Sequence, residues 1–113
     1  MPKGDFIGEF ELYVLLAIVH LGEDAYGIRI RQEIERRTGR EIVIGAIYAT
    51  LGRLKDKSLV DFTLSAPEPV QGGRTRKHYY LTADGARAVR HSTSMLTKMM
   101  AGADLRTAAR RPD

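Results

Sequence analysis

One stretch, residues 45–82, constrains the fold of this 113-residue chain more than any other, because it combines a helical pattern with two strand patterns. Within residues 45–57, Ile47, Leu51 and Leu54 recur at i, i+4 and i+7, the spacing of one apolar helix face. Strand-like alternation begins directly after this helix. The chain is therefore predicted to be α+β and mainly α, with a hairpin following a helix.

The hairpin is predicted over residues 59–81. Apolar residues alternate with polar ones from Val60 to Ser65, as in a half-buried strand, and a second strand is predicted over residues 77–81. The connection between the strands contains residues that interrupt a ladder, namely Pro67, Pro69, Gly72 and Gly73. Two short strands joined in this way form a β-hairpin, or wing.

Two helices are predicted before this unit, over residues 8–21 and 25–37. The first carries apolar groups around nearly its whole circumference, so it needs burial on more than one side. The second carries Ile30 and Ile34 on one face, and Asp24 is placed to cap its start. In so small a chain, a second subunit is a natural partner for the remaining apolar surface of the first helix.

A last helix is predicted over residues 82–101, with Thr82 as its N-cap. Its apolar residues recur at intervals of three and four, the pattern of a coiled-coil seam. We predict dimerisation through this seam and the first helix, by Ala86, Val89, Thr93, Leu96 and Met100 together with Phe10, Leu12 and Leu16. The alternative is that the seam folds back onto its own domain. Residues 102–113 lack periodicity and are predicted to form a basic, disordered tail.

Composition narrows the class of protein. The chain has no cysteine, which excludes disulfides, thiolate metal sites and a cysteine nucleophile, and fits a reducing compartment. Its longest apolar run, Leu12–Ile18, is too short to span a bilayer, and acidic residues precede it where a signal peptide would be basic. We therefore expect a cytoplasmic protein with no membrane partner.

Charge is divided unevenly along the chain. Residues 1–24 hold one lysine against five acidic residues, whereas residues 25–57 hold eight basic residues against four acidic ones. Residues 66–78 and 79–113 add further net positive charge. Such local asymmetry favours attraction to a phosphate backbone, and the alternative is a solvated basic face.

Three helices, a wing and a last helix form the order of a winged helix-turn-helix, whose second motif helix lies in the DNA major groove. Residues 45–57 are the predicted recognition helix, with DNA-facing residues Ala46, Tyr48, Ala49, Thr50, Arg53 and Lys57. Arg53 can read guanine bidentately, and the methyl groups of Ala49 and Thr50 can pack on thymine. The alternatives are a salt bridge from Arg53 to a carboxylate of the second helix, and a half-buried Tyr48.

The wing supplies the predicted contacts with the DNA backbone. Its DNA-binding residues are Gly72, Gly73, Arg74, Arg76 and Lys77. The basic side chains are placed to contact phosphate or the minor groove, and the glycines let the tip approach closely. The alternative is a basic surface loop. Residues 1–81 would then form the DNA-binding domain and residues 82–101 the dimerisation helix.

Enzyme signatures are absent from the sequence. His20, His78 and His91 lack metal-ligand spacing, no lysine-bearing phosphate loop follows a strand, and no nucleophile–base arrangement stands out. We therefore expect no catalysis, no metal and no cofactor.

At these residues the chain closely resembles the PadR family of bacterial transcriptional regulators, in its short form with a single C-terminal helix. The resemblance extends from Glu9 to Met100. It rests on Ala25-Tyr26-Gly27-Ile28, on Gly45-Ala46-Ile47-Tyr48-Ala49-Thr50-Leu51 with Arg53-Leu54, and on Gly72-Gly73-Arg74, Lys77, Tyr79-Tyr80-Leu81-Thr82 and Gly85. These pieces stand in the right order, which makes the signal specific.

The resemblance implies a homodimer that binds a roughly palindromic operator in double-stranded DNA, usually as a repressor. Some members of the family release DNA on binding phenolic acids or flat hydrophobic drugs, so a small hydrophobic or phenolic effector is a further implied partner. The absence of tryptophan argues against a tryptophan-stacking drug site. Phe6, Phe10, Tyr13 and the methionines remain as candidates to line a pocket.

Two positions depart from the family pattern. Val43 stands where Ser or Thr often precedes the recognition helix, so that helix lacks a side-chain cap that contributes about 1 kcal/mol. Ser58 replaces a common glycine at the end of the same helix, where a left-handed turn is strained for a residue with a side chain.

The residues leave a second function open. A winged-helix protein-interaction module would keep the fold and use its basic face on an acidic protein partner. Binding that is indifferent to changes at Ala49 and Thr50 would distinguish such a module from a DNA reader.

Overall fold

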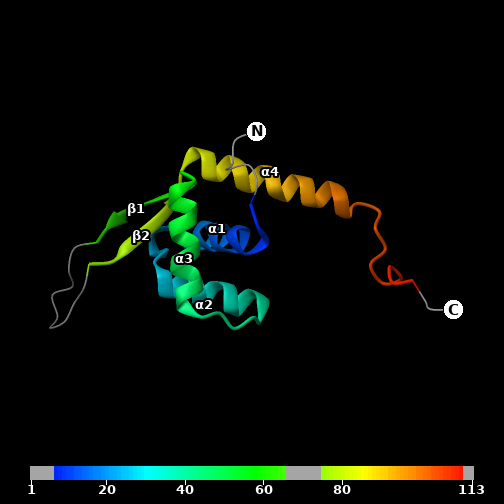
Figure 1. Cartoon of the computed structure of the whole chain (residues 1–113), viewed down its shortest axis with the longest axis horizontal. Helices are drawn as coiled ribbons and strands as arrows, with labels where there is room; N and C mark the ends of the chain where they lie inside the picture. Colours follow the sequence, from blue (N-terminus) through cyan, green and yellow to red (C-terminus); the bar gives the residue numbers. More distant parts are fainter. Residues whose placement is uncertain (1–6, 66–74, 111–113) are drawn as a thin grey trace.

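A computed structural model describes residues 7–65 and 75–110 of the chain. Its elements are α1 (Glu9–Leu21), the 3₁₀ helix η2 (Gly22–Asp24), α2 (Gly27–Thr38), α3 (Ile44–Asp56), β1 (Val60–Leu64), β2 (Lys77–Leu81) and α4 (Ala83–Met100). Helices α1 to α3 gather into one body, from which the hairpin extends on one side and α4 on the other (Figure 1). The predicted α+β, mainly α fold with a two-stranded hairpin is confirmed.

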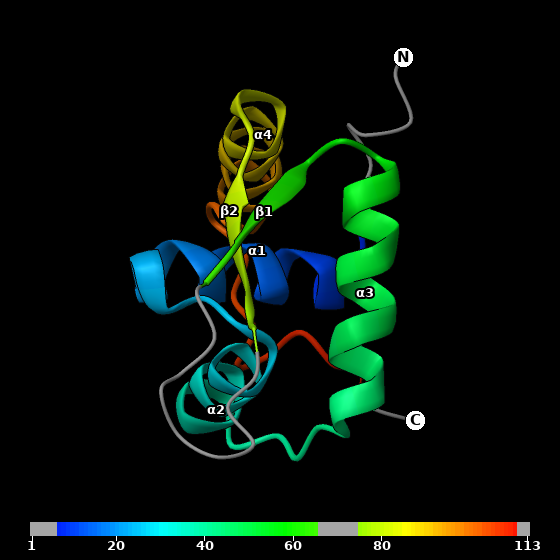
Figure 2. The same cartoon turned by 90° about the vertical axis from the view of Figure 1, so that its left-hand side faces the viewer.

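Helix α1 is the centre of the core. Val14, Leu15 and Ile18 are at most 3% exposed, and α1 contacts α2, α3, β2 and α4. Figure 2 shows α1 lying between α4 and α2, with α3 standing across one end. The apolar faces predicted for the other elements meet there and contribute Ile30, Ile34, Ile47, Leu51, Leu54, Leu59, Val60 and Tyr79. Each buried aliphatic side chain of this size stabilises the fold by about 1.5–3 kcal/mol relative to an exposed one.

The start of α2 differs from its prediction. Asp24 belongs to the 3₁₀ helix, and its carbonyl accepts a hydrogen bond from the backbone N–H of Tyr26 at 2.9 Å. Tyr26 is therefore the N-cap residue, and no side-chain hydrogen bond caps the helix. The prediction that Asp24 caps α2 is wrong, because Asp24 ends the 3₁₀ helix and two further residues separate it from Gly27, where α2 begins.

The hairpin is antiparallel, with Val60 opposite Leu81 at its base. It is tied to the helices where the backbone N–H of Tyr79 donates to the carbonyl of Ala25 at 2.8 Å. This bond fixes β2 against the link between α1 and α2. The connection over residues 66–74 lies outside the described residues, and with it the predicted contact residues Gly72, Gly73 and Arg74.

Backbone and hydroxyl hydrogen bonds join the end of α3 to the start of α4. The N–H of Thr82 donates to the carbonyl of Leu59 at 3.0 Å, and its hydroxyl donates to the carbonyl of Ser58 at 2.7 Å. The same hydroxyl accepts from the N–H of Gly85 at 3.0 Å, which confirms Thr82 as the N-cap of α4. Ser58 has a φ of 62°, so the left-handed turn predicted at this position is confirmed.

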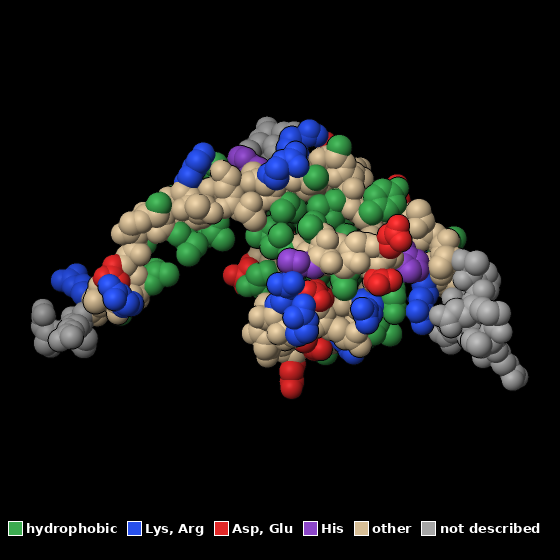
Figure 3. Space-filling view, turned by 180° about the vertical axis from the view of Figure 1, so that it is seen from behind, with side chains coloured by type: hydrophobic (Ala, Val, Ile, Leu, Met, Phe, Trp, Pro, Cys, Tyr) green, Lys and Arg blue, Asp and Glu red, His purple; other side chains and the backbone are tan. Residues whose placement is uncertain are grey.

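Only the first half of α4 packs on the body. Ala88 and Val89 are buried, whereas Leu96, Met99 and Met100 are 53%, 80% and 51% exposed. Figure 1 shows the second half projecting beyond the other helices. Its apolar side chains gather on the side that faces the body (Figure 3). Helix α4 therefore carries an apolar surface that the described part of its own chain does not cover.

Gly85 is required by the close contact between α4 and the segment after α3. A β-carbon at this position would lie 1.9 Å from the carbonyl oxygen of Leu59. We expect Gly85→Ala to lower the free energy of unfolding by at least about 2 kcal/mol, because backbone cannot move aside as the end of a side chain can. Urea unfolding measures this change.

Gly52→Ala in α3 is the matched control. Nothing lies within 4 Å of a β-carbon at Gly52, and alanine favours a helix, so this variant should gain about 0.5–1 kcal/mol of stability. If Gly85→Ala were as stable as the wild type, the contact with Leu59 would not exist as described.

Candidate nucleic-acid interface

Helix α3 presents one open face to solvent. Gly45, Tyr48, Ala49, Gly52 and Arg53 are all exposed. The centre of this face has no bulky side chains. Nothing lies within 4 Å of a β-carbon placed at Gly45 or Gly52. Figure 2 shows α3 at the edge of the body, beside the hairpin and uncovered on its outer side. Such a face lets a partner approach the helix backbone closely.

This open face is rotated from the predicted one. Thr50, predicted to face DNA, is 1% exposed, and Ala46 packs partly against the core. The reason is helical geometry: Thr50 lies one turn before Leu54, about 40° from it around the helix axis, so both point inward. The prediction that Thr50 contacts bases is wrong. Ala49 and Arg53 are exposed, as predicted.

A buried carboxylate on α1 lies against the C-terminal end of α3. Glu11 is 8% exposed, and Nζ of Lys57 donates to its two oxygens at 3.0 and 2.9 Å. The backbone N–H of Gly8 donates to the same carboxylate at 3.0 Å. Lys57 was predicted to point towards phosphate, and in the structure its ammonium group is engaged with α1.

Arg53 extends outward from the same region. Its side chain is 57% exposed, and its Nε lies 4.0 Å from Oε2 of Glu11. Its Nη2 donates to Oγ1 of Thr50 at 2.9 Å. The alternative prediction placed a carboxylate partner on the second helix, but the carboxylate beside Arg53 is on α1. The guanidinium therefore stays accessible while two groups orient it.

The surroundings of Glu11 determine its ionisation. Burial alone would raise the pKa of this carboxyl group. Hydrogen bonds from Lys57 and Gly8, together with the charges of Lys57 and Arg53, outweigh burial and hold the pKa below its ordinary value of 4.5. Glu11 is therefore ionised at neutral pH, and Lys57 has a charged partner there.

Tyr48 packs over the start of α2. A β-carbon at Gly27 would lie 2.6 Å from the ring and hydroxyl of Tyr48, so the glycine makes room for the ring. Tyr48 is nevertheless 52% exposed, which combines features of the DNA-contact prediction and of its half-buried alternative. The ring of Tyr79 is buried, and burial, with Tyr48 as a second cause, raises the pKa of Tyr79.

Two cations of the wing, at the end of the described hairpin away from its base, lie against aromatic rings. The guanidinium of Arg76 lies 4.5 Å from the ring centre of Tyr26, and Nζ of Lys77 lies 4.6 Å from that of Phe62. Both basic residues are exposed. Cation–π contacts of this kind orient a charged group without removing it from solvent. The wing thus presents positive charge to solvent, and its strand β1 contacts α3.

The predicted dimer residues fall into three groups. Val89 is buried in the core of its own chain, which corrects its prediction as an interface residue and supports the fold-back alternative for the first half of α4. Leu96 and Met100 are exposed. The others are partly buried on α1 and α4, namely Phe10, Leu12, Leu16, Ala86 and Thr93.

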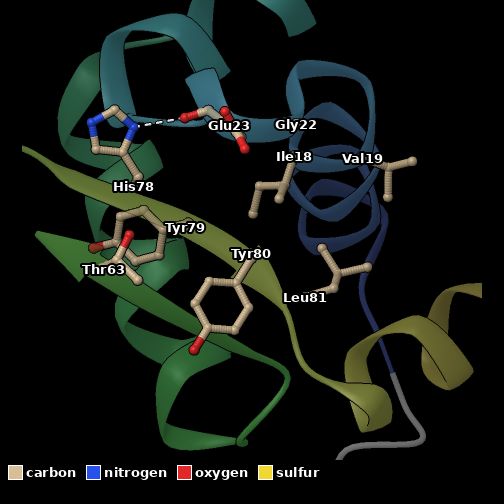
Figure 4. A pocket seen from close by; sticks show the side chains of 9 residues that line it. All are labelled: Ile18, Val19, Gly22, Glu23, Thr63, His78, Tyr79, Tyr80 and Leu81. Carbon is tan, nitrogen blue, oxygen red and sulfur yellow. Dashed lines mark hydrogen bonds between the residues drawn. The ribbon is translucent and has the colours of Figure 1, made fainter. Parts of the chain in front are cut away.

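An open hollow of about 510 Å³ lies between the end of α1 and β2. Figure 4 shows its lining, which consists of Ile18, Val19, Gly22, Glu23, Thr63, His78, Tyr79, Tyr80 and Leu81. Nδ1 of His78 is hydrogen-bonded to the carbonyl of Glu23 at 2.7 Å. Of the residues predicted to line a pocket, Tyr13 and Phe10 line two other hollows, and Phe6 lies outside the described residues.

Sequence reasoning missed Glu11, Tyr26 and Gly27 as residues that shape this surface. In the sequence Glu11 adds only to an acidic N-terminus, because nothing local shows that residue 57 lies beside it. A signal is present nonetheless: a carboxylate in an otherwise apolar helix needs a partner when it is buried. The Tyr26-Gly27 pair at a helix start is a comparable signal, since only a small residue leaves room for another ring.

Within residues 7–65 and 75–110, no cluster of three or more side chains suited to a metal ion occurs. His20 instead contacts Arg37, with 3.2 Å between Nδ1 and Nη2. No helix in the same ranges is both long enough and apolar enough to cross a membrane.

Known proteins share this fold and part of this sequence. A family model described as "Transcriptional regulator PadR-like family" matches residues 15–91. The structure of RosR from H. salinarum aligns with a TM-score of 0.61 at 27% identity, covering 87% of this chain and 81% of that one. A PadR family transcription regulator from Clostridium difficile R20291 aligns with a TM-score of 0.59 at 26% identity, covering 79% and 93%.

Likeness to a PadR-like transcription factor from Bacteroides fragilis concerns the fold alone. That structure aligns with a TM-score of 0.64 at 23% identity, covering 80% of this chain and 82% of the other. No curated protein sequence matches the chain.

Fold and family match together define a winged helix-turn-helix transcriptional regulator. The chain belongs to the PadR-like family, which confirms the resemblance seen in its sequence. Members of the family are transcription regulators and not enzymes, as expected. A bacterial source stays a prediction, because the relatives include RosR from the archaeon H. salinarum.

Glu11→Gln keeps the shape of the side chain and removes its charge. At pH 7 we expect the free energy of unfolding to fall by about 1–3 kcal/mol, because Lys57 loses its ion pair. The folded-state pKa of Glu11 is lowered, so its contribution is present above 4.5 and is lost as pH falls through the folded value. The stability gap between wild type and variant should therefore close in acid.

Urea unfolding between pH 7 and about pH 3 measures this gap. Glu41→Gln, in the exposed segment between α2 and α3, is the control and should leave stability nearly unchanged. A gap that is the same at every pH would contradict the role given to the Glu11 carboxylate.

Proposed function

We propose that this regulator is a homodimeric repressor that reads a roughly palindromic DNA operator. The observation that carries the proposal is the open face of α3, which stands beside the exposed cations of the wing on a body whose α4 ends in an uncovered apolar surface. The first two features suit a DNA groove, and the third suits a second copy of the chain.

On this proposal α3 enters the major groove by its open face. The small centre of that face, formed by Gly45, Ala49 and Gly52, lets the helix approach the base edges closely. Tyr48 and Arg53 flank it and reach outward. An arginine in this position can donate two hydrogen bonds to guanine, which discriminates between base pairs by about 1–3 kcal/mol.

The wing supplies the part of the affinity that does not depend on sequence. Arg76 and Lys77 are exposed and already oriented by Tyr26 and Phe62, so they lose less freedom when they meet phosphates. Each neutralised phosphate releases counterions, so affinity falls as salt rises. From the sequence, we propose that Gly72, Gly73 and Arg74 extend this contact.

The projecting half of α4 is the proposed dimer contact. Leu96, Met99 and Met100 expose apolar side chains, and the outer side of α1 adds the partly buried Leu12 and Leu16. A small chain with such a surface is completed by a second copy. Two-fold symmetry then sets two α3 helices on half-sites about 34 Å apart, which is why the operator should be palindromic.

Release by a small hydrophobic or phenolic effector is the remaining part of the proposal. The hollow shown in Figure 4 supports it, because its lining combines apolar Ile18 and Leu81 with the hydroxyl-bearing Thr63 and Tyr80. Gel-shift titration of the protein–DNA complex with a panel of phenolic acids tests this part separately.

Selection of bound duplexes from a random pool would yield the operator and its half-site spacing. On the selected duplex we expect Arg53→Ala to weaken binding by about 1–3 kcal/mol, with little change on a scrambled duplex. Arg76→Ala should instead weaken binding to both duplexes and flatten the salt dependence by about one counterion. A wild-type protein that binds no duplex at any ionic strength would remove DNA reading from the proposal.

Leu96→Glu tests the dimer. Leu96 is 53% exposed, so the folded subunit should tolerate the change, while a carboxylate in the dimer contact should dissociate it. Sedimentation should give a wild-type mass near twice 12.6 kDa and a variant mass near 12.6 kDa. Ser94→Glu, exposed on the opposite side of α4, is the control and should stay dimeric. A monomeric wild type at micromolar concentration would exclude this interface.

A further inference from the structure

We propose that Glu11 and Thr50 are positioning residues for sequence recognition, which hold the Arg53 guanidinium on the open face of α3. We also propose that Lys57 serves this arrangement and does not contact DNA. The inference rests on the proposed function, because it concerns how the same face discriminates between sequences. Its test is arranged so that the two can fail separately.

The described core contains few polar side chains, and they lie close to one surface arginine. Among the described residues, the buried polar or charged side chains are Glu11 at 8% and Thr50 at 1% exposure. Both approach the same cation, Arg53, which is itself 57% exposed. Burying a polar group costs free energy unless it has a partner. Both buried polar groups approach the same surface arginine, which indicates that they hold its side chain in position for contact with DNA.

Glu11 holds its two basic neighbours at different distances. Lys57 donates to both carboxylate oxygens at 3.0 and 2.9 Å, whereas Nε of Arg53 stays 4.0 Å away. Lys57 therefore makes the short hydrogen bonds and leaves Arg53 with a weaker, orienting attraction. Without Lys57, the carboxylate would draw the guanidinium inward and away from the open face. In this arrangement Lys57 keeps Arg53 available.

The conformational entropy of the long Arg53 side chain affects how well it can bind a base. A free arginine loses several rotatable bonds when it docks on a base, and this loss opposes binding. The hydrogen bond from Nη2 to Thr50 fixes one end of the fork before DNA arrives. Other donor nitrogens of the guanidinium remain for the base. Arg53 can thus read a base at a lower entropic cost than an unheld arginine.

Thr50→Val tests the first contact, because valine keeps the buried shape and removes the acceptor. The probes are a duplex selected from a random pool by the wild-type protein and a scrambled duplex of equal composition. We expect Thr50→Val to lower the preference for the selected duplex by about three- to tenfold, with binding to the scrambled duplex and the salt slope unchanged. Thermal unfolding confirms that the variant is folded.

A double-mutant cycle assigns that loss to Arg53. Arg53→Ala should reduce the preference less in the Thr50→Val background than in the wild type, since the two side chains act together. Thr38→Val is the matched control, because the Thr38 hydroxyl also makes a hydrogen bond but lies at the end of α2. It should leave the preference unchanged.

Lys57→Met separates positioning from direct contact. A lysine that touches phosphate would, when removed, flatten the salt slope by about one counterion and weaken binding to both duplexes alike. We expect instead an unchanged slope and a loss of preference of about three- to tenfold, because Glu11 then captures Arg53. Lys55→Met, an exposed neighbour on α3, controls for the loss of one positive charge.

Different results would contradict this inference and the proposed function. A flattened slope with Lys57→Met, or additive effects of Thr50→Val and Arg53→Ala, would overturn this inference and leave DNA reading intact. A wild-type protein with no preference for any selected duplex would overturn the proposed function itself.

Discussion

Burial of α1 is the constraint on which the rest of the structure depends. This helix is apolar around most of its circumference, and α2, α3, β2 and α4 each pack on part of it. Val14 and Leu15 are fully buried as a result. Because α3 and β2 are both held against this central helix, the directions of α3 and of the wing are set relative to each other. A reading surface made from separate elements needs such a common support.

Polar groups enter this core where they connect it to the surface. Glu11 reaches from α1 to Lys57 and Arg53 at the end of α3, and the backbone of Tyr79 bonds to Ala25 between the helices. In both links each buried polar group has a hydrogen-bond or ion-pair partner, so its burial costs little free energy while it fixes how the elements are oriented. The carboxylate that joins α1 to the end of α3 therefore also orients the solvent-facing Arg53.

Local patterns predicted most of the fold. The spacing of Ile47, Leu51 and Leu54 fixes the inner face of α3, Thr82 caps α4 as a threonine before a helix does, and Ser58 takes the left-handed turn expected there. Each of these depends on neighbours within one or two turns. Val43 likewise begins α3 with no side-chain cap, as predicted.

The candidate site was harder to predict because exposure depends on the full width of the buried face. Thr50 was assigned to the outer face as a polar residue, yet the core extends around the helix far enough to include it. Val89 was assigned to a partner subunit, yet the start of α4 packs on its own body. In both cases the residue type suggested one environment and the packing of distant segments produced another.

The sequence by itself determined the order of helices and strands, the family and the places where cations gather, since these follow from spacing and composition. Only the tertiary structure decided which cation of α3 and its end is held against α1 by short hydrogen bonds and which extends into solvent. Lys57 and Glu11 are 46 residues apart in the chain, and α1 must pack against α3 before their charges meet. An ion pair forms where folding brings opposite charges together in a partly dry environment, and no local pattern encodes that meeting. Here the ion pair with Glu11 engages Lys57, while the Arg53 side chain faces outward.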